Sequence, residues 1–340
     1  MKTHFKLIVK TTLISVYVIF LAGSVVRMTG SGMGCPDWPK CFGYLIPPTS
    51  EEQITWKPKT QYAKGSIIVA DESLYLAQKD LKTGLEFDQN QWEKYSKHDY
   101  AVFNVYHTWT EYVNRLTSAI SGIFFLIMVI ASLKFWKKNK QTTLLAFFGL
   151  FLMIFEAWLG KTVVDSVLKP SIITVHMVTG LVIIAVLIKI LHSHTPTNKE
   201  GKKYNKGFHT LLLISAIFSL IQIALGTQVR QFVDEQIKIF GFENKQMSLY
   251  NPNLKFYIHR SFTIAIILIN LAIFYKNEIL RLKFDLPKWI LGLLTLEAIT
   301  GMLMFYSDFP LGTQAVHLLS GALLFGVQFY LILQNRQLKD

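Results

Sequence analysis

The hydrophobic residues of this chain gather in long runs instead of the narrow stripes that are typical of helices in soluble proteins. Each run is roughly 20 residues long, the length that a helix needs to cross about 30 Å of hydrocarbon. Eight such runs lie near residues 8–28, 107–133, 143–163, 171–192, 209–230, 257–276, 287–306 and 312–334. The pattern therefore predicts an all-α membrane protein with eight transmembrane helices, surrounded by membrane lipid.

The formal net charge of +13 is unevenly distributed along the chain. Lys and Arg cluster before the first run and after the second, fourth, sixth and eighth runs, whereas the loops on the other side carry fewer. By the positive-inside rule both termini are cytoplasmic, which requires an even number of spans. The charge thus indicates topology and not nucleic-acid binding, and we expect a multi-pass protein of the cell inner (cytoplasmic) membrane.

Two cysteines, Cys35 and Cys41, lie just beyond the first run on the non-cytoplasmic side. That compartment favours a disulfide over a metal site, which would normally need more ligands. The spacing also lacks the C-x-x-C-H pattern of covalent heme attachment. A structural disulfide and a redox-active pair are both compatible with the sequence.

Four short segments recur in the same order in both halves of the chain. The first pair is Gly23-Ser-Val-Val-Arg27 with Gly226-Thr-Gln-Val-Arg230, and the second is Tyr112-Val-Asn-Arg115 with Tyr257-Ile-His-Arg260. The third is Glu156-Ala-Trp-Leu-Gly160 with Glu297-Ala-Ile-Thr-Gly301, and the fourth is Val175-His-Met-Val-Thr-Gly180 with Val316-His-Leu-Leu-Ser-Gly321. Glu156 and Glu297 are 141 residues apart, as are His176 and His317.

Each half holds four spans, so both halves begin on the same side and the repeat is parallel. The sequence therefore predicts two four-helix bundles, formed by residues 1–195 and 196–340. The main asymmetry is a long outer loop at residues 29–105, which is long enough for a small extramembrane cap.

Ionisable groups inside a bilayer are costly, so each is a functional candidate. His259 and His317 lie at similar depth in the second half. Two neutral imidazoles that face each other across a bundle are what a bis-histidine heme requires, because each presents a nitrogen lone pair to the iron. A copper ion is the alternative, although no third ligand or methionine cluster is evident near them.

In the first half the equivalent pair is Asn114 and His176. Asparagine is a poor iron ligand, so this half is expected to hold heme less firmly and to leave one axial side open. This asymmetry suits a stored cofactor in the second half and a reacting substrate in the first. Glu111 lies one helical turn before Asn114 and is a candidate proton acceptor. An ion pair with Arg115 is the alternative role for this carboxylate.

Further charged residues accompany the repeated segments. The arginines at the outer ends of spans are candidates for the heme propionates, with interfacial snorkelling as the alternative; they are Arg27, Arg115, Arg230 and Arg260. Glu156 and Glu297 lie within spans, as proton carriers or as hydrogen-bonded anchors.

At these residues the chain resembles the heme A synthase family of bacteria and mitochondria. The matching segments are residues 23–43 (GSVVRMTGSGMGCPDWPKCFG), Glu111-Tyr-x-x-Arg115, His176, His259-Arg260 and His317, and the resemblance covers all eight spans. It implies oxidation of the C8 methyl of heme O to a formyl group, giving heme A for terminal oxidases. It also implies a heme O synthase (protoheme farnesyltransferase) and an electron acceptor as partners.

The resemblance implies roles for individual residues as well. His259 and His317 would hold heme b, the substrate heme O would lie near His176 and Glu111, and Cys35 and Cys41 would form an outer-loop disulfide. The family motif usually reads Glu-Tyr-x-His-Arg, whereas this chain has Asn114 at the histidine position.

Two other classes of function fit the sequence. One is a non-catalytic heme-binding membrane cytochrome that carries electrons, which is consistent with Asn114. The other is a parallel-repeat transporter, in which the histidines are incidental. A homo-oligomer is compatible with the sequence in each case.

Overall fold

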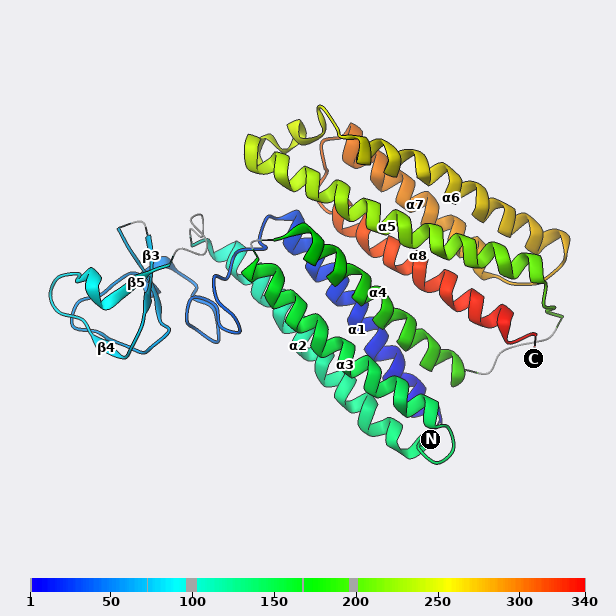
Figure 1. Cartoon of the computed structure of the whole chain (residues 1–340), viewed down its shortest axis with the longest axis horizontal. Coiled ribbons are helices and arrows are strands. Elements are labelled where there is room, and N and C mark those ends of the chain that lie inside the picture. Colours follow the sequence, from blue (N-terminus) through cyan, green and yellow to red (C-terminus); the bar gives the residue numbers. More distant parts are fainter. Residues whose placement is uncertain (1, 72, 96–102, 167, 196–200, 340) are drawn as a thin grey trace. The chain divides into compact units, whose positions relative to one another are not determined.

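The computed structural model of the chain describes residues 2–71, 73–95, 103–166, 168–195 and 201–339. Within these residues, eight helices are long and apolar enough to cross a membrane (Figure 1). They are α1 (Lys2–Met28), α2 (Val105–Ser132), α3 (Lys140–Asp165), α4 (Pro170–Ser193), α5 (Lys206–Phe240), α6 (Leu254–Ile279), α7 (Leu286–Tyr306) and α8 (Thr313–Arg336). Each overlaps one predicted hydrophobic run, so the prediction of an all-α membrane protein with eight spans is confirmed.

Helix α5 differs most from its predicted run, which ended at residue 230. Its outer extension is polar and is stabilised by side-chain pairs one turn apart. Arg230 pairs with Asp234 at 2.7 Å, and Gln231 donates a hydrogen bond to Glu235 at 2.7 Å. Hydropathy marks the end of the apolar run, whereas these polar pairs let the helix continue to Phe240.

Contacts within the chain divide it into two compact units. The helical unit comprises Met1–Ser24, Thr117–Leu159 and Pro170–Asp340, and the outer unit comprises Val25–Leu116 and Gly160–Lys169. The helical unit contains spans from both predicted halves. The parallel repeat and the division of the chain at residue 195 stay predictions.

The helical unit has two apolar clusters. The first is formed by side chains of α1, α2, α3, α4 and α8, among them Phe5, Phe125, Leu152, Leu187 and Phe325. The second is formed by α5, α6, α7 and α8, among them Phe208, Ile266, Ile290 and Leu331. Helix α8 contributes to both clusters, and it packs against α4, α5 and α7. Large apolar side chains on the outer helix surfaces, such as Ile14 and Phe151, are exposed, as expected for surfaces that face lipid.

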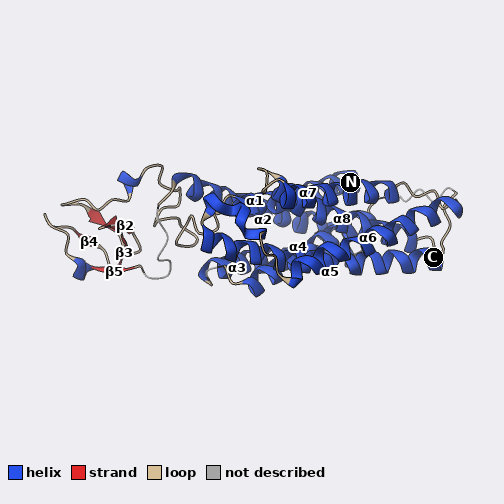
Figure 2. Cartoon of the chain, turned by 90° about the horizontal axis from the view of Figure 1, so that it is seen from above, coloured by secondary structure: helices blue, strands red, loops and turns tan. Residues whose placement is uncertain are grey.

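The outer unit contains the described strands, which Figure 2 shows in red. Strands β2 (Ile67–Ala70), β3 (Ser73–Ala77) and β5 (Trp92–Lys94) form one antiparallel sheet in the order β2-β3-β5, and β1 (Gln61–Tyr62) pairs with β4 (Leu81–Lys82). Part of the long loop predicted at residues 29–105 thus forms strands. Residues 72 and 96–102 of that loop lie outside the described residues.

Four short 3₁₀ helices complete the described secondary structure. They are η1 (Glu51–Gln53), η2 (Gln89–Gln91), η3 (Leu133–Phe135) and η4 (Phe242–Leu249). Of these, η4 packs against α5 in the helical unit.

Candidate functional site

The best-defined polar group inside the helical unit surrounds His317 on α8. Its Nδ1 lies 3.2 Å from Oε2 of Glu297 and 2.9 Å from Oγ1 of Thr300, and both partners belong to α7. Helices α7 and α8 lie side by side (Figure 1). Because Glu297 and Thr300 are one turn apart, they present their oxygens on the same face of α7 toward one imidazole nitrogen.

His176 on α4 has the corresponding partner on α3. Its Nδ1 forms a close imidazole–carboxylate pair with Oε2 of Glu156. The side chain of His176 is 42% exposed and that of His317 is 25% exposed, so the first imidazole is more accessible. The residues with a common 141-residue offset in the sequence therefore form the same kind of pair in space.

A glycine lies one turn after each histidine, beside the carboxylate. A Cβ atom at Gly180 would lie 2.8 Å from Cζ of Phe20 and 3.5 Å from Oε1 of Glu156, and one at Gly321 would lie 3.7 Å from Oε1 of Glu297. Small residues let membrane helices approach closely. The close approach is that of the Phe20 ring to Gly180, whereas both carboxylates lie at ordinary contact distance.

His259 on α6 lies in a different environment. Among the described residues, no group forms a hydrogen bond with its buried Nδ1. A Cβ atom at Gly226 of α5 would lie only 3.1 Å from Cε1 of the ring, so this glycine forms part of the wall beside the imidazole. His259 on α6 and His317 on α8 belong to helices that share the second apolar cluster. That the two imidazoles face each other across the bundle stays a prediction.

The two predicted arginines of the helical unit differ in their contacts. Arg230 donates to Oε1 of Gln314 at 2.7 Å and pairs with Asp234, so it ties α5 to the start of α8. Arg260 follows His259 on α6 and is exposed. Arg260 lies in the first turns of α6, whereas α5 continues past Arg230 to Phe240.

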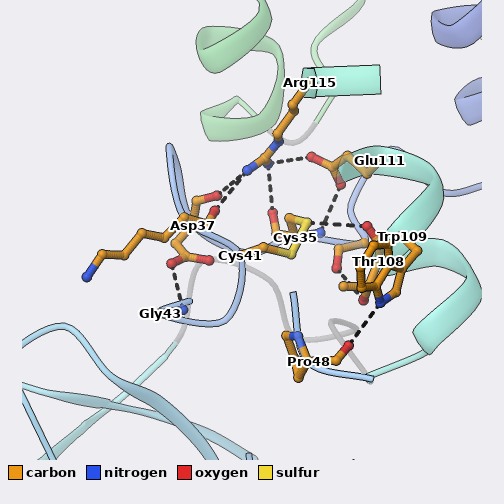
Figure 3. Close-up of a disulfide and its surroundings, with 11 residues drawn as sticks. Cys35, Asp37, Cys41, Gly43, Pro48, Thr108, Trp109, Glu111 and Arg115 are labelled. Atoms are coloured by element: carbon orange, nitrogen blue, oxygen red, sulfur yellow. Dashed lines mark hydrogen bonds and ion pairs between the residues drawn. A yellow bond between two sulfur atoms is a disulfide. The ribbon is translucent and has the colours of Figure 1, made fainter. Parts of the chain in front are cut away.

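In the outer unit, Glu111 and Arg115 hold the disulfide loop against the start of α2 (Figure 3). Glu111 is buried; its Oε2 accepts a hydrogen bond from the backbone N–H of Cys35 at 2.9 Å, and its Oε1 pairs with Arg115 at 2.5 Å. Arg115 also donates to the carbonyl oxygens of Cys35, Asp37 and Lys40, at 3.3, 2.7 and 2.9 Å. The ion pair between Glu111 and Arg115, one of the two roles considered for Glu111, is therefore formed.

Cys35 and Cys41 form a disulfide, with both residues buried. Asp37 lies inside the closed loop, where its carboxylate accepts a hydrogen bond from the N–H of Gly43 at 2.9 Å. Burial raises the pKa of the Asp37 carboxyl, while the Gly43 N–H and the Arg115 guanidinium act in the opposite direction. The loop is thus held by a covalent bond and by several charge-assisted hydrogen bonds.

The remaining predicted residues also lie in the outer unit. Asn114 is one turn from Glu111 on α2, and Arg27 lies in the last turn of α1. His107, which also lies on α2, forms a hydrogen bond through Nδ1 with the hydroxyl of Ser31 at 2.9 Å. This hydrogen bond gives His107 a structural role in the unit.

Several residues of the site were missed in the sequence. Thr300 contacts His317, Ser320 donates to the Glu297 carboxylate, and Gly226 borders His259. Each belongs to one of the repeated segments, so their signal was present. The sequence could not show that Thr300, one turn after Glu297, contacts His317. Nor could it show that Ser320, one turn after His317, contacts Glu297.

These features define a multi-pass helical membrane protein with imidazole–carboxylate pairs between its helices and a disulfide-closed loop. The chain matches the COX15-CtaA family, described as cytochrome oxidase assembly protein, over residues 6–83 and 66–329. Because the match covers most of the chain, the protein belongs to this family.

Individual relatives are similar over nearly the whole length. A protein of Listeria welshimeri named heme A synthase is 22% identical over 345 residues, which is 98% of this chain and 96% of the relative. A heme A synthase of Bacillus mycoides is 22% identical over 348 residues, 98% of this chain and 94% of the relative. One of Shewanella oneidensis is 22% identical over 220 residues, 64% of this chain and 54% of the relative.

We predict that Gly34→Ala disrupts the disulfide loop. A Cβ atom at this position would lie 2.9 Å from the backbone nitrogen of Thr108 and would also overlap the carbonyl group of His107, so the loop must move away from α2. Overpacking of this kind costs about 1–3 kcal/mol. Thermal unfolding and thiol labelling at a low concentration of reductant are the measurements; we expect a lower melting temperature and faster reduction and labelling of Cys35 and Cys41.

Gly84→Ala is the matched control, because no atom lies within 4 Å of a Cβ added there. It should behave as the wild type. Equal stability and equal thiol protection of the two variants would contradict the packing of Gly34 against α2.

Proposed function

We propose that this protein is a heme A synthase, an oxidoreductase that converts the C8 methyl of heme O to a formyl group and so makes heme A for terminal oxidases. The observation that carries the proposal is the similarity to relatives named heme A synthase over 98% of the chain. The histidines on the spanning helices support it, because a heme enzyme needs axial ligands inside its bundle.

We propose heme b as the resident cofactor, held by His259 and His317. The residues fit this group on two observations. Nδ1 of His317 is occupied by Glu297 and Thr300, which leaves Nε2 as its ligand nitrogen. Gly226 leaves space beside the imidazole of His259. Heme b, when bound, would supply one-electron transfer at a potential that depends on the axial ligands and their hydrogen bonds.

For the substrate, we assign His176 as the axial ligand of heme O. Its higher exposure suits a ligand that must bind and release a substrate in each catalytic cycle. Asn114 occupies the position at which the family motif usually has histidine. Because asparagine is a poor iron ligand, this assignment includes no second protein ligand. The open axial side would be the reacting side.

We assign Glu111 as the proton acceptor of the reaction. Its carboxylate is fixed by the Cys35 N–H and by Arg115, so its orientation is determined before a substrate binds. Each carboxylate oxygen keeps a further lone pair for a proton. A base that is positioned in advance needs little reorganisation during the reaction.

The arginines at the outer ends of the spans would bind the heme propionates. Arg260 is exposed and adjacent to His259, which suits this role. Arg230 already pairs with Asp234 and Gln314, so a propionate would have to share it. Arg27 and Arg115 belong to the outer unit, and the same role is proposed for them.

We further propose the cell inner membrane as the location, with both termini in the cytoplasm. The distribution of Lys and Arg supports this orientation. It places the disulfide on the oxidising side of the membrane, where such bonds persist. A heme O synthase and an electron acceptor are the expected partners.

Production of heme A tests the enzyme proposal directly. We expect cells that make heme O, but lack their own heme A synthase, to accumulate heme A when they express this chain, as measured by heme extraction and chromatography. Heme binding without heme A above background would instead identify a non-catalytic cytochrome. A purified protein without any heme absorption would favour a transporter.

The assignment of His176 predicts a separation of functions. We expect His176→Ala to abolish heme A formation while the purified protein keeps heme b, because His259 and His317 remain. The measurements are the heme A content of the cells and the Soret absorption of the protein. Loss of heme b in the same variant would mean that His176 is a ligand of the resident cofactor.

Gly226→Ala tests the heme pocket at His259. The added methyl would approach the imidazole to 3.1 Å, which is closer than ordinary contact, so the ring must tilt away from its ligand position. We expect a loss of heme b absorption per mole of protein. Gly292→Ala on α7 is the control, because a Cβ atom there would meet no atom within 4 Å. Normal heme content in both variants would argue against a role of Gly226 in the heme pocket.

A further inference from the structure

The hydrogen bonds around His317 determine which of its ring nitrogens carries the proton. The hydroxyl of Thr300 donates to the carbonyl oxygen of Leu296 at 2.8 Å. Its oxygen is then an acceptor for Nδ1 of His317 at 2.9 Å. The Glu297 carboxylate, 3.2 Å away, is an acceptor as well. The proton therefore lies on Nδ1, and Nε2 keeps its lone pair.

The Glu297 carboxylate is itself held in place. Ser320, one turn after His317 on α8, donates to its Oε1. His317 is thus fixed by two acceptors on α7, and one of these acceptors is fixed in turn by α8.

The first half has the same pair with fewer supports. Glu156 contacts Nδ1 of His176, as Glu297 does for His317. The residue 141 positions before Thr300 is Leu159, which has no hydroxyl. The residue 141 positions before Ser320 is Thr179, which is half-buried and bonds to the carbonyl oxygen of Val175 in its own helix. Ser320 makes the equivalent bond to Val316 and also contacts the Glu297 carboxylate.

We propose that Glu156 and Glu297 are positioning residues that keep the proton on Nδ1 of their histidines and so direct Nε2 toward a heme iron. Thr300 adds a second acceptor in the second half, so His317 is a permanent ligand, whereas His176 is an adjustable one. This inference rests on the proposed heme binding. It explains why one histidine suits a resident cofactor and the other suits an exchanging substrate.

The charge of the acceptor gives the proposal a measurable consequence. An imidazole that donates to a carboxylate is a more basic iron ligand than one that donates to a neutral group. A more basic ligand stabilises the ferric state and lowers the midpoint potential of the heme. Replacing the carboxylate by an amide of the same shape should therefore raise this potential.

Glu297→Gln and Thr300→Val in the full-length purified protein test the proposal. We expect Glu297→Gln to raise the midpoint potential of heme b in a redox titration. We expect both variants to retain heme about 10- to 100-fold less tightly, as is typical when a hydrogen bond to a metal-ligating histidine is removed. Thr300→Ser, which restores the hydroxyl, should recover heme retention.

Thr295→Val is the matched control on α7, because its hydroxyl bonds only to the carbonyl oxygen of Leu291 in its own helix. It should leave the potential and the heme content unchanged. Glu156→Gln should leave the potential of heme b unchanged but lower the formation of heme A, since its partner is His176.

The outcomes separate this inference from the proposed function. A wild-type protein that binds no heme overturns both. A wild type with heme b, together with Glu297→Gln and Thr300→Val variants of unchanged potential and heme retention, overturns the positioning role alone. A Glu297→Gln variant that lowers only the thermal stability means that the residue is structural. If the Glu297→Gln variant does not accumulate, the comparison of heme retention between Thr300→Val and Thr300→Ser tests the positioning role.

Discussion

A carboxylate within the hydrocarbon is stable only beside a group that shares a proton with it or balances its charge. Glu156 and Glu297 meet this requirement with an imidazole each. The other features of the helical unit follow from it. The histidines are oriented by the same contacts that stabilise the glutamates. Stability and the orientation of the imidazoles therefore depend on the same contact.

Much of the fold was predictable, because a bilayer imposes a length and a polarity on every span. The eight helices followed directly. The 141-residue offset related Glu156 to Glu297 and His176 to His317, but it did not reveal that each glutamate contacts a histidine. The roles of Thr300 and Ser320 could not be predicted, since hydroxyl residues inside spans most often bond to their own helix. The end of α5 at Phe240 was also missed, because a hydropathy profile does not detect side-chain pairs such as Arg230 with Asp234.

The outer unit shows a different limit of sequence analysis. Residues 23–43 form the most specific motif in the chain, yet Arg115, from a segment far along the sequence, holds part of it in place. Its partners are main-chain carbonyl oxygens, which every residue possesses, so no choice of side chain in the loop reveals the contact. Glu111 was recognised as a candidate because it is ionisable. Its hydrogen bond to the Cys35 N–H became visible only in the structure.

Helix α8 contributes buried side chains to the first and to the second apolar cluster. Two bundles with separate cores could lose their structure one after the other, as independent domains do. Here the detachment of one helix removes contacts from both cores at once. The helical unit should consequently unfold as one cooperative body. The loss of a buried side chain of α8 would then lower the stability of the whole helical unit.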